Sequence, residues 1–137
     1  MGTLVTGVEN GCRIFPYDAS QQIRTVIDNR TSILNQLAGL SAAPNPEAQN
    51  FYSLLQQALQ SSINADVQYK GWMDFLYTSY YNTYPVGCPG GSPRKNAAFD
   101  AARTADGQST RLKEQFVAAF NPVANRFAQP TWQASDF

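Results

Sequence analysis

The sequence contains no histidine. Histidine is the side chain most often used as a general base and as a metal ligand at neutral pH, so the usual sites built on it are excluded. The Glu-x-x-His pattern of di-iron helical bundles is excluded for the same reason. Glycine motifs for phosphate or dinucleotide binding and the nucleophile elbow are absent too, and no acidic pair is placed for acid-base chemistry. We therefore expect no enzyme activity, no metal and no cofactor.

The chain also lacks an excess of charge of either sign, because ten Lys and Arg residues balance ten Asp and Glu residues. Nucleic acids and anionic membrane surfaces attract proteins that carry a positive surplus. No run of about 18 apolar residues is present, and a membrane-spanning helix needs about that length. We expect no nucleic-acid partner and no membrane insertion by this segment.

What the sequence does have is apolar residues that recur every three or four positions over three long segments. This spacing places apolar side chains on one face of a helix. It predicts helices over residues 19–38, 46–82 and 93–121, preceded by an irregular lead-in over 1–16 and followed by a tail over 128–137. The expected fold class is therefore all-α, an up-down-up three-helix bundle in a single domain that takes in the whole chain.

Prolines mark the boundaries of these segments. Pro46 and Pro93 each follow a capping residue, and proline is well tolerated at the first position of a helix. The short linker over 41–44 should return the second helix antiparallel to the first. Pro122 lacks an N–H group and clashes with the preceding turn, so the third helix should kink or break there.

The two cysteines of the chain, Cys12 and Cys88, flank points that an up-down-up bundle brings to one end. These points are the start of the first helix, the end of the second and the start of the third. A disulfide between them would close a loop of roughly 76 residues and stabilise the fold by about 4 kcal/mol. We favour this disulfide over two free thiols. It indicates an oxidising compartment, and hence an extracytoplasmic location.

Asp66 falls in the middle of the second helix, close to its apolar rows. A buried carboxylate needs a partner, which either Arg30 or Arg111 could supply. We interpret this as a candidate buried ion pair that fixes the register of the helices, rather than as a ligand site.

Aromatic residues crowd the second half of the same helix, and helical spacing cannot put them all on one face. Tyr and Trp are favoured anchors in recognition surfaces, but they are also common in cores. The alternatives are core packing and a surface that binds a protein, peptide or glycan partner. The candidate interaction surface comprises Tyr69, Trp72, Tyr77, Tyr80, Tyr81 and Tyr84.

Two groups of residues resemble a pattern found in helical domains of actinobacterial extracytoplasmic proteins. The first group is Leu55, Ala58-Leu59, Ser62, Ala65-Asp66, Tyr69 and Trp72. The second group is Cys88-Pro89, Phe116, Asn121-Pro122, Ala124 and Phe127. The resemblance implies a cysteine-paired helical bundle outside the cytoplasm, either secreted or anchored on the outer face of the membrane. It implies no reaction.

Together these observations predict a non-catalytic extracytoplasmic helical module for interaction with a protein or a ligand. The alternative is a purely structural secreted helical protein without a small ligand. The exposure of the tyrosines distinguishes the two, because a recognition surface requires them to be accessible.

Overall fold

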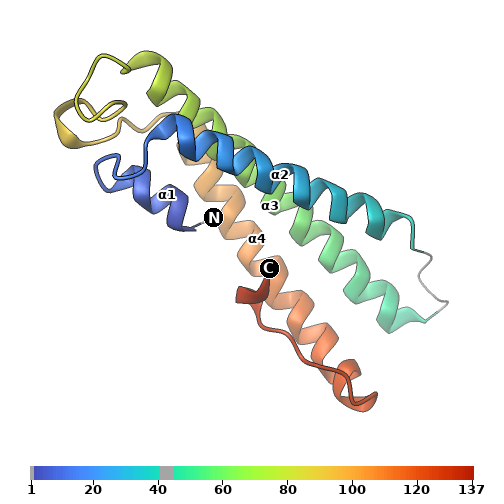
Figure 1. Ribbon diagram of the computed structural model, residues 1–137. Coiled ribbons are helices and arrows are strands. Elements are labelled where there is room, and N and C mark those ends of the chain that lie inside the picture. Colours follow the sequence, from blue (N-terminus) through green and yellow to red (C-terminus); the bar gives the residue numbers. More distant parts are fainter. Residues whose placement is uncertain (1, 41–44) are drawn as a thin grey trace.

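The computed structural model describes residues 2–40 and 45–137, and in that part of the chain it contains helices and no β-strand (Figure 1). The all-α prediction is therefore confirmed, while the predicted linker over 41–44 lies outside the described residues. The helices are α1 (Gly2–Glu9), α2 (Pro16–Ala38), α3 (Pro46–Ser79) and α4 (Ala97–Arg126), with short 3-10 turns η1 (Pro89–Gly91) and η2 (Ala134–Asp136).

The long helix α3 is the central element of the bundle. Helices α2 and α4 each pack along it, and both run opposite to it in Figure 1. Because α2 and α4 meet α3 rather than each other, a groove remains between them. At the end of the bundle where α2 starts, α1 lies in this groove, and the core gathers there. The buried core cluster consists of Val5, Val8, Ala19, Ile23, Tyr69, Trp72, Met73, Leu76, Phe99 and Ala102.

The expectation of an irregular lead-in is wrong, because residues 2–9 form α1. Val5 and Val8 lie one turn apart and are buried against α2 and α3, so tertiary packing stabilises this short helix. Gly7 is inside the helix rather than ending it. A Cβ at this position would lie 2.4 Å from Cδ1 of Ile14, so the glycine makes room for the returning chain.

Three helix boundaries also differ from the prediction. Helix α2 begins at Pro16 rather than at residue 19, because proline at the first position loses no helical hydrogen bond. Helix α3 ends at Ser79 rather than at 82. Helix α4 begins at Ala97 rather than at 93, with the side chain of Asn96 accepting a hydrogen bond from the Phe99 N–H at 3.1 Å.

The residues before α4 stay outside the helix because the core holds them. The indole N–H of Trp72 donates to the backbone carbonyl of Arg94 at 2.8 Å. This bond satisfies the polar atom of a fully buried ring and fixes the segment that leads into α4.

The predicted end of the last helix at 121 is also wrong. Helix α4 continues through Pro122 to Arg126. Pro122 deprives only the carbonyl of Ala118 of its usual donor, and both residues lie on the exposed side of the helix. Water can therefore serve that carbonyl, and the helix tolerates the missing bond.

The disulfide between Cys12 and Cys88 is confirmed, with their Cα atoms 5.9 Å apart. It joins the segment between α1 and α2 to the segment between α3 and α4. Cys88 is fully buried, so the bridge belongs to the core at this end of the bundle.

Candidate functional site

The fold divides the aromatic surface that the sequence predicted. Tyr69 and Trp72 are core residues, with 3% and 0% of their surface exposed, so their assignment to an interaction surface is wrong. Both rings face α4, where Trp72 lies 4.7 Å from the ring of Phe99 and Tyr69 lies 6.1 Å from it. The spacing of these residues directs them to the side of α3 that α4 covers.

The remaining tyrosines are accessible but do not form one surface. Tyr77, Tyr81 and Tyr84 are 38%, 60% and 95% exposed. Tyr80 is half-buried and packs its ring on Phe75 at 5.9 Å. The ring of Tyr77 lies near two aromatic residues where α2 begins, Phe15 at 5.7 Å and Tyr17 at 5.1 Å.

An apolar cavity of about 540 Å³ lies at the opposite end of the bundle, in the groove between α2 and α4 and above α3. Most of its lining is aliphatic or aromatic. Ile33 belongs to the apolar stripe of α2, yet 48% of its surface is exposed because no helix covers it there. The lining residues are Arg30, Ile33, Leu37, Phe51, Tyr52, Leu55, Leu59, Ser62, Phe116, Phe120, Trp132, Asp136 and Phe137.

Three phenylalanines build one wall of the apolar cavity. Phe116 and Phe120 are one turn apart on α4 and their rings stack at 5.3 Å. Phe51, near the start of α3, meets Phe120 edge to face at 5.3 Å. These rings fix the distance between α3 and α4 at this level and leave the side toward α2 open.

The segment after α4 turns back along the helix and covers part of the apolar cavity (Figure 1). Asn121 holds it with two hydrogen bonds to the backbone of Trp132, a donated bond of 2.9 Å and an accepted bond of 3.0 Å. The ring of Phe137 contacts Phe116 at 5.3 Å and Trp132 at 5.2 Å. We refer to residues 128–137 as the tail.

A polar cavity of about 470 Å³ adjoins the apolar one. The two cavities share Arg30, Ser62 and Phe137 in their linings, so they meet at these residues, and we refer to the two together as the cleft. The polar cavity is lined by Gly2, Arg30, Ser62, Asp66, Asp106, Thr110, Lys113, Ala134, Ser135 and Phe137.

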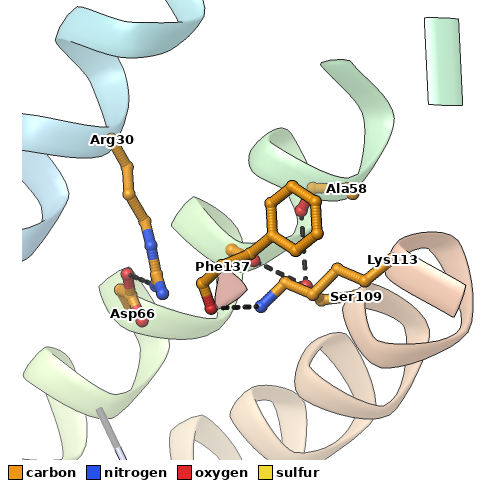
Figure 2. A network of polar contacts seen from close by, with 7 residues as sticks. Arg30, Ala58, Asp66, Ser109, Lys113 and Phe137 are labelled. Atoms are coloured by element: carbon orange, nitrogen blue, oxygen red, sulfur yellow. Dashed lines mark hydrogen bonds and ion pairs between the residues drawn. The ribbon is translucent and has the colours of Figure 1, made fainter. Parts of the chain in front are cut away.

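The charged residues at the junction are shown in Figure 2. Asp66 has 1% of its side chain exposed and forms an ion pair with Arg30, one of the two partners that the sequence offered. The other, Arg111, is exposed and forms no ion pair with a described residue. Lys113 points toward Phe137 and donates to its main-chain oxygen at 3.2 Å. No ion pair between residues that the structure describes includes Lys113.

Burial shifts the pKa values of Asp66 and Lys113 in the directions that favour their neutral forms. Burial raises the pKa of Asp66, and the charge and hydrogen bond of Arg30 oppose this shift without cancelling it. Burial and the positive charge of Arg30 lower the pKa of Lys113, while nearby carboxylates oppose them. The cleft therefore holds a partly buried lysine for which a further negative charge would be favourable.

Ser62, which lines both cavities, takes part in hydrogen bonds that join two helices. The hydroxyls of Ser62 and Ser109 share a buried hydrogen bond, and Ser109 also donates to the backbone carbonyl of Ala58 at 3.3 Å (Figure 2). These bonds join α3 to α4. Among the described residues, neither hydroxyl is hydrogen-bonded to a side chain that could act as a general base.

Within residues 2–40 and 45–137, no group of three His, Cys, Asp or Glu side chains is arranged to hold a metal ion. No helix in that part is both long and apolar enough to cross a membrane.

No sequence motif marks the cleft. Its apolar lining was visible only as part of the helix stripes, because a residue at a cavity and a residue in a core follow the same spacing. Comparison of the chain with models of protein families, with curated proteins and with solved structures finds no match.

Proposed function

We propose that this chain is a non-catalytic extracytoplasmic module that binds a small apolar molecule in the cavity between α2, α3 and α4. The observation that carries the proposal is the apolar cavity itself. Its volume of about 540 Å³ falls within the range of about 300 to 1,000 Å³ that is common for small-molecule sites. Such sites are mostly apolar with a few polar groups, and this one has that composition.

The energetics of packing support the proposal. Protein interiors are close-packed, and a side chain that lines empty space loses the contacts that a neighbour would supply. Ile33, Leu55 and Phe51 are only partly covered although they lie on the inner faces of their helices. An apolar ligand would cover them and stabilise the fold in proportion to its occupancy.

The extracytoplasmic part of the proposal is supported by the disulfide. Disulfides persist in oxidising environments outside the cytoplasm and are rare inside it. The bridge between Cys12 and Cys88 is partly buried in the core and closes most of the bundle into one loop. The resemblance to helical domains of actinobacterial extracytoplasmic proteins points to the same location.

The proposal is tested with N-phenyl-1-naphthylamine, an uncharged probe whose fluorescence rises in apolar surroundings. We expect saturable binding at one site per chain. Leu55→Trp fills the cavity and should abolish this binding. Leu54→Trp is the matched control, because Leu54 is the neighbouring residue of α3 and is not part of the cavity lining.

Probe binding that survives Leu55→Trp unchanged would show that the cavity is not the site. Absence of binding to the unmodified protein would favour the alternative of a purely structural protein. Circular dichroism of both variants checks that the added ring has not unfolded the bundle.

A further inference from the structure

We propose that the ligand is a single-chain amphiphile with an anionic head. Its apolar chain lies in the apolar cavity and its head binds Lys113 in the adjoining polar cavity. This inference rests on the proposed function, and it adds the chemical class of the ligand and its orientation in the cleft.

The lining of the cleft changes from apolar to polar along its length. The apolar cavity is closed toward α4 by Phe116 and Phe120, and its apolar lining ends at Arg30 and Ser62. The polar cavity begins at these same two residues. A ligand that occupies both must therefore be apolar over most of its length and polar at one end.

The charged residues of the polar cavity determine which head group fits there. Asp66 is fully buried and already neutralised by Arg30, so this pair has no net charge to offer. Asp106 is exposed to water, which screens its charge. Lys113 is half-buried, and its ammonium group donates to a main-chain oxygen of Phe137 and to no side-chain carboxylate of the described residues. An anionic head would place an opposite charge beside Lys113, whereas a cationic head would add to the repulsion between Lys113 and Arg30.

The tail occupies the position that we assign to the head of the ligand. Lys113 bonds Phe137, and the ring of Phe137 lies on Phe116 at the border of the apolar cavity. The last residue of the tail thus makes the two contacts that we assign to the ligand, one with the lysine and one with the apolar wall. The ligand replaces both contacts when it binds, while Asn121 still holds Trp132.

The test compares three ligands with the same chain and different heads: decanoate, 1-decanol and decyltrimethylammonium. Their affinities for the unmodified protein are measured by calorimetry, below the micelle concentrations of the two ionic ligands and below the solubility limit of decanol. A charged hydrogen bond contributes about 1.5 to 3 kcal/mol, so decanoate should bind roughly ten- to a hundredfold more tightly than decanol. Decyltrimethylammonium should bind more weakly than both.

Variants then assign the preference to one residue. Lys113→Gln should reduce the affinity for decanoate to that for decanol, and Lys113→Arg should retain the preference. Lys70→Gln is the matched control, because Lys70 pairs with Asp74 at 2.7 Å and lines neither cavity. The readout is the ratio of the affinities for decanoate and decanol, because a variant that only loosened the structure would weaken the binding of both ligands alike.

The outcomes separate this inference from the proposed function. Equal affinities for decanoate and decanol would overturn the anionic head and leave the apolar site in place. A preference that persists in Lys113→Gln would also overturn it. If none of the three ligands binds while N-phenyl-1-naphthylamine does, the inference fails and the proposed function stands. If neither the ligands nor the probe binds, both fail.

Discussion

Arg30 of α2 and Asp66 of α3 form an ion pair at the border between the apolar and the polar cavity. The carboxylate lies fully inside the bundle, and the guanidinium is mostly covered. The pair joins the two helices at one level and sets how far the apolar part of the cleft extends.

Arg30→Gln should destabilise the protein by about 3 to 5 kcal/mol near neutral pH, because it leaves a buried charge without a partner. Burial holds the pKa of Asp66 above its ordinary value of 3.8, and loss of Arg30 raises it further. A group with a raised pKa stabilises the fold below its unfolded pKa and loses this effect as pH rises through the folded pKa. The cost of the substitution should therefore grow with pH.

Urea unfolding at about pH 3 and about pH 7 measures this dependence. The control is Arg111→Gln on the exposed side of α4, which should change stability by less than about 0.5 kcal/mol. An equal cost of Arg30→Gln at both pH values would contradict the electrostatic explanation.

Removal of the disulfide should lower stability by about 4 kcal/mol, because the bridge closes a loop with a sequence separation of 76. Urea unfolding should show this loss of stability in the double variant Cys12→Ala with Cys88→Ala, and the same loss in the reduced protein. The accompanying check is thiol titration of the denatured, unreduced chain. It should find no free thiol, and two free thiols would contradict both the bridge and the compartment inferred from it.

Substitution by alanine at two glycines should change the stability of the protein in opposite directions. Gly87 has a φ of +85°, and a Cβ there would lie 2.6 Å from Cγ of Pro16. Gly87→Ala should therefore cost about 2 to 4 kcal/mol from backbone strain and overpacking. Gly71 lies within α3 with nothing near its missing Cβ, so Gly71→Ala should stabilise by up to about 1 kcal/mol. Urea unfolding of both variants provides the comparison, and a stable Gly87→Ala protein would contradict the contact with Pro16.

Asn121→Ala should release the tail without unfolding the bundle. The fluorescence of the tail can be followed directly, because the chain has two tryptophans and Trp72 is fully buried. Trp132 is 42% exposed, so acrylamide quenching should rise by up to about twofold when the two bonds to Asn121 are lost. Asn125→Ala, one turn further along α4, should leave quenching unchanged. If both variants quench alike, Asn121 does not hold the tail.

Local sequence patterns predicted the features of this fold that depend on one helix at a time. The apolar spacing identified the three long helices, and the antiparallel order that follows from them placed Cys12 beside Cys88. The buried position of Asp66 followed from its place among apolar residues on α3. Each of these inferences needs only the helical period and the topology.

The features that the sequence missed depend on contacts between distant residues. The segment 1–16 was predicted to be irregular, because nothing near Gly7 in the sequence shows that Ile14 lies against that glycine and that α1 packs on the core. Pro122 was predicted to kink or break the last helix. The sequence does not show that Pro122 and the freed carbonyl are exposed to water, because this exposure depends on how α4 lies on α3. The cavity depends on the separation of α2 and α4, which no single stripe of apolar residues encodes.

The unequal filling of the groove between α2 and α4 has a consequence for motion. Where α1 fills it, Val8, Ile23, Trp72 and Leu76 are fully buried and the nearby disulfide ties the segments together. Where only the tail covers it, the lining is partly exposed. Amide hydrogen exchange should accordingly be fastest in the halves of α2, α3 and α4 that border the apolar cavity. A ligand can then enter and leave by opening of that half alone, while the half beside the disulfide stays folded.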